Sequence, residues 1–324
     1  MARTDNFANF ATDVANSIRE MTGKTDKIPA SQFDVEIKSI STGSGEEVVL
    51  QDKTVTVTSN GRQTVTADDG YTALNSVDII TNVSGDLPSK YITVTQWQKS
   101  GHPIKYSIKG VSNLPQYYFY KNPFVQEVDI QDTMSIINSY CFQDCTNLEH
   151  IYLPNTIGFF GQSCFQGCSK LKLEELPPNL DPYMNENTIF SECSSITIKK
   201  IPDSVTYISG NGIFRNCSSM TQISMKNVTG IGGGSEYWGD FSYTGLRAAW
   251  IGSAITNSSF GRYAFSGCDD LKKMFIDLPR ATVEGMTGYS NKWGATYATV
   301  ICNDDSDFVT KDVFDATDWL SVIG

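Results

Sequence analysis

Charged residues and histidines are scarce in this sequence. Asp, Glu, Lys and Arg make up only 19% of its 324 residues, and there are two histidines. The 36 acidic residues outnumber the 25 basic ones, which gives a formal net charge of −11. Such a balance offers no charge-based affinity for nucleic acid, while a hydrophobic share of 40% argues against intrinsic disorder. We therefore expect a folded protein without a nucleic-acid partner.

Long apolar runs are also missing. No stretch approaches the roughly 18 to 20 consecutive apolar residues that cross a bilayer, so no membrane insertion is expected. The first twenty residues contain Asp5, Asp13 and Glu20 and lack the apolar core of a signal peptide. Synthesis in a reducing cytoplasm would keep the eight cysteines as thiols. We interpret them as small core residues rather than disulfides.

Patterns that carry catalysis are absent as well. His102 and His150 have no recognisable nucleophile or carboxylate partner. The glycine-rich segment 230–234 lacks the Lys-Ser/Thr pair of a phosphate-binding loop. The acidic segment 304–307 is not followed by the closing glutamate of a calcium loop. The sequence therefore predicts no enzyme, no metal site and no cofactor.

A repeat of an aromatic residue followed three positions later by a cysteine fills the second half of the chain. The five copies are Phe142 with Cys145, Phe165 with Cys168, Phe190 with Cys193, Phe214 with Cys217, and Phe265 with Cys268. A sixth, degenerate unit has Phe241 with Thr244. Successive phenylalanines are 23, 25, 24, 27 and 24 residues apart. A period this regular is typical of a solenoid.

Most units continue into a short strand pattern. Leu148–Leu153, Met220–Met225 and Leu271–Ile276 have apolar residues at the first, fourth and sixth places. Ile196–Ile201 departs from the pattern because Lys199 occupies the fourth place. A strand, a turn and an aromatic-bearing arc form one coil, which buries its apolar side only by stacking on neighbours. The aromatic run 117–120 is interpreted as the strand that caps the first coil.

These units resemble the BspA-type leucine-rich repeat. The segment 201–208 followed by Phe214 and Cys217 is the copy nearest to that pattern, and the resemblance covers about residues 125 to 280. It implies a β-rich solenoid. The resemblance fails at residues 226–243, where a glycine-rich insertion replaces the usual proline turn.

Aromatic side chains at this interruption are the candidate ligand-binding residues. Tyr237 and Trp238 lie within the insertion, and Trp250 follows one strand later. Aromatic faces beside amide and hydroxyl groups suit sugars or a partner protein, because stacking and hydrogen bonding act together. The alternative is that these rings fill the gap left by an irregular coil.

The N-terminal residues show a helical pattern. Apolar side chains recur at three- and four-residue steps over residues 5–21, which predicts an amphipathic helix, and a second short helix is expected from Pro29. The expected attachment or oligomerisation face consists of Phe7, Phe10, Val14, Ile18 and Met21. Packing of the two helices on each other or on the next domain is the alternative.

Residues 46–84 change to a strand pattern. Val55 and Val57 alternate with threonines, Asn60-Gly61 is a type I′ turn signal, and the alternation returns at 64–66. This arrangement predicts a β-hairpin. A further strand around residues 77–80 would complete a small β module.

Two segments of this region are similar to tailed-bacteriophage structural proteins. They are residues 10–28 and residues 64–79, whose TVTADDGYTALNSVDI sequence looks like a "TVTPDxGYDGLSSV" segment of phage fibre and tail proteins. The resemblance implies a virion protein, made in the host cytoplasm, that binds other virion proteins through its N-terminal region.

The predicted fold is mixed. Five parts are expected: an α-helical segment at 1–45, a small β-hairpin module at 46–84, a linker and solenoid N-cap at 85–125, leucine-rich repeats at 126–290 and a C-terminal cap at 291–324. The expected function is display of the solenoid for recognition of a glycan or protein on the host surface. A homo-oligomer, with a trimer favoured, would provide multivalent binding. The alternatives are a purely structural head-fibre, decoration or baseplate component, or a bacterial BspA-like surface adhesin.

Overall fold

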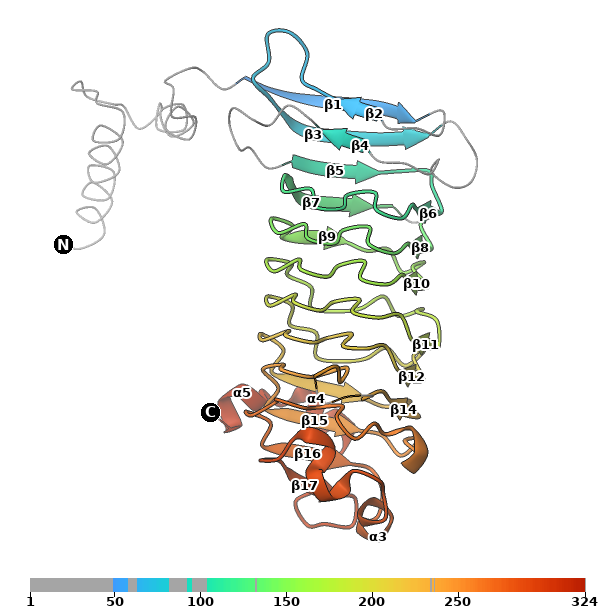
Figure 1. Ribbon diagram of the computed structural model, residues 1–324, viewed down its shortest axis with the longest axis vertical. Coiled ribbons are helices and arrows are strands. Elements are labelled where there is room, and N and C mark those ends of the chain that lie inside the picture. Colours follow the sequence, from blue (N-terminus) through green and yellow to red (C-terminus); the bar gives the residue numbers. More distant parts are fainter. Residues whose placement is uncertain are drawn as a thin grey trace, which may run out of the picture.

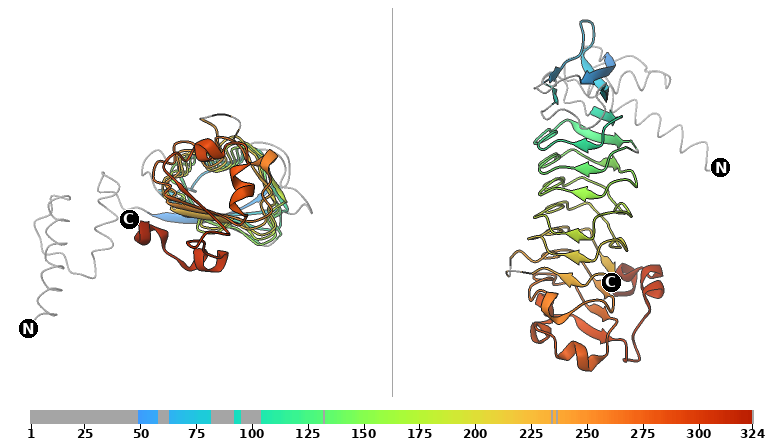
Figure 2. Two further views of the ribbon diagram at one scale, coloured as in Figure 1. Left: turned by 90° about the horizontal axis from the view of Figure 1, so that it is seen from below. Right: turned by 90° about the vertical axis from the view of Figure 1, so that its right-hand side faces the viewer.

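The computed structural model describes residues 49–57, 63–81, 92–94, 104–131, 133–233, 235 and 237–323. The predicted helices at 1–45, with Phe7, Phe10, Val14, Ile18 and Met21, lie outside the described residues, as does His102. The described chain forms one long stack of coils, with the first strands at one end and the C-terminal third at the other (Figure 1). Seen along the stack, successive coils superimpose on one another (Figure 2).

Most coils contribute a strand to parallel sheets on one side of the stack; the coils that contain residues 171–176 and 196–201 do not. Five strands form the first part of this side in the order β1(Leu50–Val57), β3(Ala73–Thr81), β5(Ile104–Ile108), β7(Val125–Ile130) and β9(His150–Tyr152). Four strands form the second part, β13(Gln222–Met225), β15(Ala248–Ile251), β16(Lys273–Ile276) and β17(Thr299–Cys302). All of these pairings are parallel, as expected when every coil runs in the same direction.

Shorter strands line a second side of the coils. One parallel sheet contains β6(Asn113–Leu114), β8(Ile136–Ile137) and β10(Phe159–Phe160), and another contains β11(Tyr183–Met184), β12(Tyr207–Ile208) and β14(Gly230–Ile231). Near the N-terminal end, β2(Gln63–Val65) pairs with β4(Ile92–Val94). Most of the two-residue strands place the second residue inside and the first nearer the surface, as with Ile137 and Ile136 in β8; both residues of β14 are buried.

The predicted β-hairpin is wrong. β1 pairs in parallel with β3, so that Val55 lies opposite Ile79, and β2 pairs with β4 rather than with β1. The residues before and after Asn60-Gly61 therefore belong to different sheets. The physical reason is that a parallel coil gives each of these strands a partner in the next coil, whereas a two-stranded hairpin alone buries little. β3 in turn pairs with β5, and the solenoid sheet thus begins at β1.

The repeat strands lie where the sequence predicts them. β9, β13 and β16 fall within the predicted segments 148–153, 220–225 and 271–276. Segment 196–201 forms no named strand and makes only an isolated bridge between Lys200 and Ser224. Lys199, at the fourth place of this segment, thus lies where the sheet is interrupted between β9 and β13.

Phenylalanine rings form a continuous column inside the solenoid. The stacked series is Phe119, Phe142, Phe165, Phe190, Phe214, Phe241 and Phe265, with neighbouring ring centroids 5.1 to 5.6 Å apart. All are buried. Residues 117–120 are turns rather than the predicted cap strand, because Phe119 occupies the repeat position one coil earlier.

The repeat cysteines connect consecutive coils. Each thiol donates a hydrogen bond to the backbone carbonyl of a column phenylalanine in the preceding coil, as from Cys145 to Phe119 at 3.0 Å and from Cys217 to Phe190 at 3.1 Å. Cys168, Cys193 and Cys268 repeat this contact. A small side chain with a weak donor therefore both fits the core and pairs a buried carbonyl.

The C-terminal residues lie on the outer face of the second sheet. α3(Arg280–Glu284) and η3(Tyr289–Gly294) precede β17, while α4(Lys311–Ala316) and α5(Trp319–Ile323) follow it; η2(Asn257–Ser259) is a separate short turn. α4 and α5 lie outside the ring of coils (Figure 2). A second hydrophobic cluster of Ala248, Trp250, Phe275, Ile301, Phe314 and Trp319 joins these helices to the strands.

The free edge of β17 is covered by an ion pair between Arg280 and Asp305. Thr299 and Asn303 donate backbone hydrogen bonds toward the previous coil, so the alternate groups of β17 face away from it. Two of these outward groups are occupied: Arg280 Nη2 donates to the Val300 carbonyl at 3.2 Å, and the Cys302 N–H donates to Asp305 at 2.7 Å. The last strand therefore offers few open backbone groups to another strand.

Candidate functional site

The irregular coil at residues 226–243 is a packed part of the solenoid. β14 continues the second-side sheet, and its glycines lie against neighbouring backbone. A Cβ on Gly239 would come within 1.9 Å of the Tyr263 carbonyl oxygen, and one on Gly233 within 2.6 Å of the Ala264 nitrogen. Glycine is required here because the coils approach too closely for a side chain. The insertion thus projects from a rigid base.

Aromatic and guanidinium groups stack at the surface of this coil. The Arg215 guanidinium lies 4.9 Å from the ring of Trp238 and 5.8 Å from that of Tyr243. Arg215 Nε donates to the backbone carbonyl of Tyr237 at 3.1 Å, and Glu192 lies 3.7 Å from Arg215. We call Arg215, Tyr237, Trp238 and Tyr243 the aromatic platform. Arg215 binds it together, since cation–π contacts and a charge-assisted hydrogen bond act on the same side chain.

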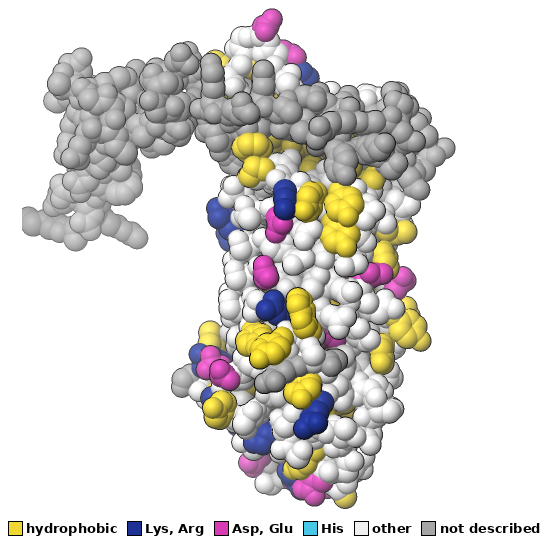
Figure 3. All heavy atoms as spheres, in the orientation of Figure 1, with side chains coloured by type: hydrophobic (Ala, Val, Ile, Leu, Met, Phe, Trp, Pro, Cys, Tyr) yellow, Lys and Arg dark blue, Asp and Glu magenta, His cyan; other side chains and the backbone are white. Residues whose placement is uncertain are grey.

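The platform is exposed although Arg215 contacts the rings of Trp238 and Tyr243 and the backbone of Tyr237. Tyr237 is 62% exposed and Trp238 is 45% exposed, so a ligand can reach both rings. In the space-filling view, hydrophobic side chains form separate clusters beside Lys or Arg on the visible face (Figure 3). The surface is therefore mixed in character, with aromatic faces next to positive charge.

Trp250 does not join the platform. It lies in β15 and is only 4% exposed, because α4 and α5 cover it. Its indole N–H donates to the Val309 carbonyl at 3.0 Å. Of the three aromatic residues predicted to bind a ligand, the structure brings together Tyr237 and Trp238 and assigns Trp250 to the core. The sequence could not show this, since the covering helices begin sixty residues later.

All eight cysteines are buried free thiols, in agreement with their interpretation as core residues. Burial raises the pKa of Cys145 to about 12 and that of Cys268 to about 11, because a thiolate would lose its hydration there. These thiols are accordingly in the unreactive, protonated form at neutral pH.

Asp240 is a buried carboxyl beneath the platform. One of its oxygens accepts a hydrogen bond from the Ile213 N–H at 3.3 Å, whereas Oδ2 is buried with no hydrogen-bond partner. Oδ2 lies against Gly232, where a Cβ would come within 2.5 Å of it. Burial raises the pKa of Asp240 to about 8. It occupies the position before the column phenylalanine that is cysteine, isoleucine or alanine before Phe142, Phe165, Phe190, Phe214 and Phe265.

The described residues contain no group of three or more His, Cys, Asp or Glu side chains that could hold a metal ion. Asp305, part of the acidic segment 304–307, is engaged by Arg280. Nor does any helix in the described ranges have the length and apolar character needed to cross a membrane.

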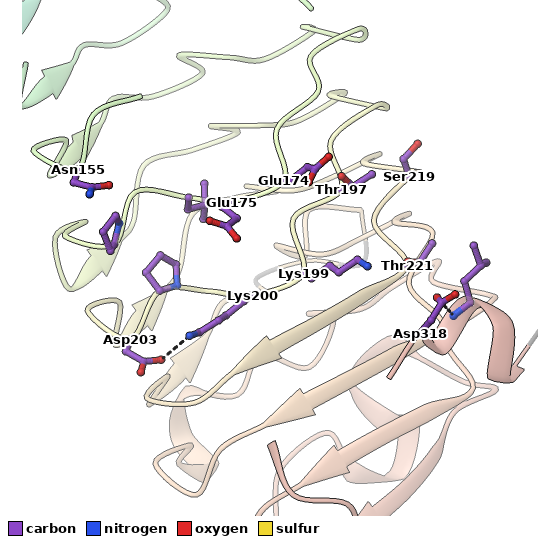
Figure 4. A pocket seen from close by; sticks show the side chains of 14 residues that line it. Asn155, Glu174, Glu175, Thr197, Lys199, Lys200, Asp203, Ser219, Thr221 and Asp318 are labelled. Carbon is purple, nitrogen blue, oxygen red and sulfur yellow. Dashed lines mark hydrogen bonds and ion pairs between the residues drawn. The ribbon is translucent and has the colours of Figure 1, made fainter. Parts of the chain in front are cut away.

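A groove on the first side of the solenoid was not predicted from the sequence. It has a volume of 860 Å³ and lies where the strand pattern fails between β9 and β13. Figure 4 shows Asn155 and Asp203 near one end, and Ser219, Thr221 and Asp318 near the other. The sequence does contain a sign of this groove. In segments 171–176 and 196–201 the second apolar residue, Leu173 or Ile198, is at the third place instead of the fourth.

A comparison with known families agrees with the repeat geometry. The BspA type leucine rich repeat region matches in six copies, over residues 112–235 and 184–272. Residues 112–272 form a BspA-type leucine-rich repeat region. The phenylalanine column and the cysteine hydrogen bonds are thus features of BspA-type coils in this chain, and the aromatic platform is an elaboration of one such coil.

Solved structures that match the chain include bacterial leucine-rich repeat proteins. A leucine-rich repeat protein of T. pallidum is 21% identical with a TM-score of 0.43, and the match covers 62% of this chain and 87% of that one. A leucine-rich repeat protein of Bacteroides ovatus is 18% identical (TM-score 0.34; 62% and 69% covered), and the pneumococcal vaccine antigen PcpA is 16% identical (TM-score 0.38; 81% and 61% covered). No curated protein matches the chain in sequence.

Proposed function

We propose that this protein is a non-catalytic recognition protein that binds a glycan or protein on another surface through the aromatic platform. The observation that carries the proposal is the stack of Trp238, Arg215 and Tyr243, which is exposed to solvent and yet fixed by its own contacts. Rings that are already ordered lose little conformational entropy when a ligand binds. Their faces offer stacking, and Arg215 offers hydrogen-bond donors to an acceptor on the ligand.

For the setting of this recognition we propose the outside of a bacteriophage particle. The proposal is supported by the similarity of residues 10–28 and 64–79 to phage structural proteins. In that arrangement the N-terminal region attaches to other virion proteins and the leucine-rich repeats are displayed. Several copies, as in a trimer, would strengthen weak individual contacts by effective concentration.

A bacterial BspA-like surface adhesin is the second candidate, and the family match over residues 112–272 is equally compatible with it. The two settings differ in where the protein resides. Recovery in purified phage particles supports the virion proposal, whereas recovery in the envelope fraction of uninfected bacteria supports the adhesin.

The test of recognition is binding of the purified full-length protein to intact bacterial cells, compared with a Tyr237→Ala/Trp238→Ala variant. We expect the double variant to lose binding by about tenfold or more, since interface aromatics often contribute over 1.4 kcal/mol each. The matched control is Tyr71→Ala/Tyr297→Ala, which removes two exposed rings, 45% and 65% exposed, from other coils.

Equal binding by the wild type and the platform variant contradicts the platform as the site. Equal loss in both double variants indicates non-specific apolar adsorption. Absence of binding by any of the proteins, at concentrations high enough to offset lost multivalency, contradicts recognition and favours the purely structural role.

A further inference from the structure

The groove has a specific structural origin in two consecutive irregular coils. In segment 171–176 both Glu174 and Glu175 are exposed, and in segment 196–201 both Lys199 and Lys200 are exposed. Each pair replaces the single outward residue that lies between inward residues in a regular strand. These two coils add no strand to the sheet between β9 and β13, and the groove lies there.

Part of the backbone in the first of these coils makes no hydrogen bond with the neighbouring coils. Within the part of the chain that the structure describes, residues 174–176 make no backbone hydrogen bond with either neighbouring coil, whereas Lys172 and Leu173 on one side still do. Unpaired main-chain N–H and C=O groups are available to water or to a ligand. This differs from the regular strands, whose ladders occupy such groups.

Charges in the groove are also left without partners. Elsewhere on the solenoid, opposite charges on neighbouring coils pair across short distances: Lys105 with Glu127 at 2.9 Å, Arg215 with Glu192 at 3.7 Å, and Lys172 with Glu149 at 3.8 Å. Among the described residues, Glu174, Glu175 and Lys199 make no ion pair, although acidic and basic pairs occupy consecutive coils. Lys200 pairs with Asp203 at 3.9 Å (Figure 4).

The lining indicates the class of ligand. It contains no aromatic side chain on which a sugar ring could stack, but has Leu176, Pro178, Pro202 and Leu320 among hydroxyl and charged groups. Four carboxylates and two lysines line it. Asp203 pairs with Lys200 and Lys226, so a ligand with positive charge gains most at Glu174 and Glu175, which make no ion pair among the described residues. The groove is open to solvent, and its volume of 860 Å³ is within the range of ligand-binding clefts.

We propose that this groove binds an extended peptide segment that carries Lys or Arg side chains. The basic side chains lie against Glu174 and Glu175, while a main-chain carbonyl or an acidic group of the peptide accepts a hydrogen bond from Lys199. Asp318, which precedes α5, closes the end of the groove near Thr221 (Figure 4). This site is separate from the aromatic platform and binds a different class of partner.

The test uses a fluorescein-labelled octapeptide of alternating lysine and alanine, with an octapeptide of alternating glutamate and alanine as its counterpart. Fluorescence anisotropy with the full-length protein should give saturable binding of the lysine peptide only, and the affinity should fall as salt rises. Glu174→Gln/Glu175→Gln should weaken binding by about tenfold, since close charge pairs contribute 1.4 kcal/mol or more. The same charge change at the exposed pair Asp269→Asn/Asp270→Asn is the matched control and should alter binding less than twofold.

Two further measurements keep the proposal falsifiable. Lys199→Gln tests the contact to the peptide main chain and should weaken binding of the lysine peptide despite removing a like charge. Circular dichroism melting establishes that each variant is folded. Equal weakening by both acidic double variants would show attraction by net charge alone and overturn the site. Absence of saturable binding, or preferential binding of a neutral chitooligosaccharide that is lost in the Glu174→Gln/Glu175→Gln variant, would overturn the peptide class.

Discussion

A single buried carboxyl distinguishes the irregular coil from its neighbours. Asp240 stands where other units have a small or apolar residue, and Oδ2 has no hydrogen-bond partner. Its pKa is raised to about 8 by burial, against about 3.9 for an aspartate in an unfolded chain. Between these two values the unfolded chain releases a proton that the folded protein retains.

Stability should therefore fall as pH rises through this window. The steepest loss for one such group is about 1.4 kcal/mol per pH unit, and it ends once the pH exceeds the folded-state pKa of about 8. Asp240→Asn should flatten the dependence and raise the free energy of unfolding at pH 7, because the amide has no charge to bury. Urea unfolding at pH 5, 7 and 9 measures this.

Asp269→Asn serves as the control, since Asp269 is exposed and its replacement should leave the pH dependence unchanged. Parallel stability curves for the wild type and Asp240→Asn would contradict the buried-acid interpretation.

The irregular coil carries the aromatic platform, and substitution of its glycines tests whether the coil is rigid. A methyl group on Gly239 meets the Tyr263 carbonyl oxygen at 1.9 Å, whereas one on Gly158 meets nothing nearer than 3.7 Å. Gly239→Ala should destabilise the protein by roughly 1–3 kcal/mol through steric overlap. Gly158→Ala should be nearly neutral. Urea midpoints distinguish the two, and equal midpoints would indicate that the coil yields easily.

At the scale of the elements, the sequence predicts what repeats and misses what depends on a distant partner. The positions of Phe142 to Phe265 are visible in the sequence because every coil imposes the same burial. The predicted hairpin is wrong because the Asn60-Gly61 signal reflects only a local turn preference. β1 instead pairs with β3 of the next coil.

The candidate site was likewise predictable only where it interrupts the repeat, and not where it depends on residues from other coils. Tyr237 and Trp238 could be chosen because they interrupt a regular pattern, but Arg215, which binds the platform together, lies in the preceding coil. Trp250 is covered by helices that no local pattern connects to it. Predicting the groove would have required knowing that the Glu174-Glu175 and Lys199-Lys200 pairs lie on consecutive coils.

For the whole molecule, the ion pair at β17 limits contact with other chains. The Arg280 guanidinium lowers the pKa of Asp305, so this pair is retained at neutral pH and is lost only as pH falls through the lowered value. Removing it should expose the Val300 and Cys302 backbone groups as an open strand edge. Arg280→Ala and Asp305→Asn should each produce species larger than the wild type in sedimentation velocity, increasing with protein concentration.

Lys311→Ala is the control for this experiment, because it breaks the ion pair with Asp315 within α4 and leaves the edge covered. Sedimentation identical to the wild type for the Arg280 and Asp305 variants would show that the edge is protected by other means.

The stack of coils has one end at which the edge strand, β17, is covered by the Arg280–Asp305 pair. We expect the pair to block addition of a strand at the end that contains β17, so that copies of the protein do not lengthen into filaments by joining there. Contacts between copies of the protein are then expected at other surfaces, while the edge of β17 stays covered by Arg280 and Asp305. On this expectation, the Arg280–Asp305 pair ends a parallel stack to which a further coil could otherwise be added.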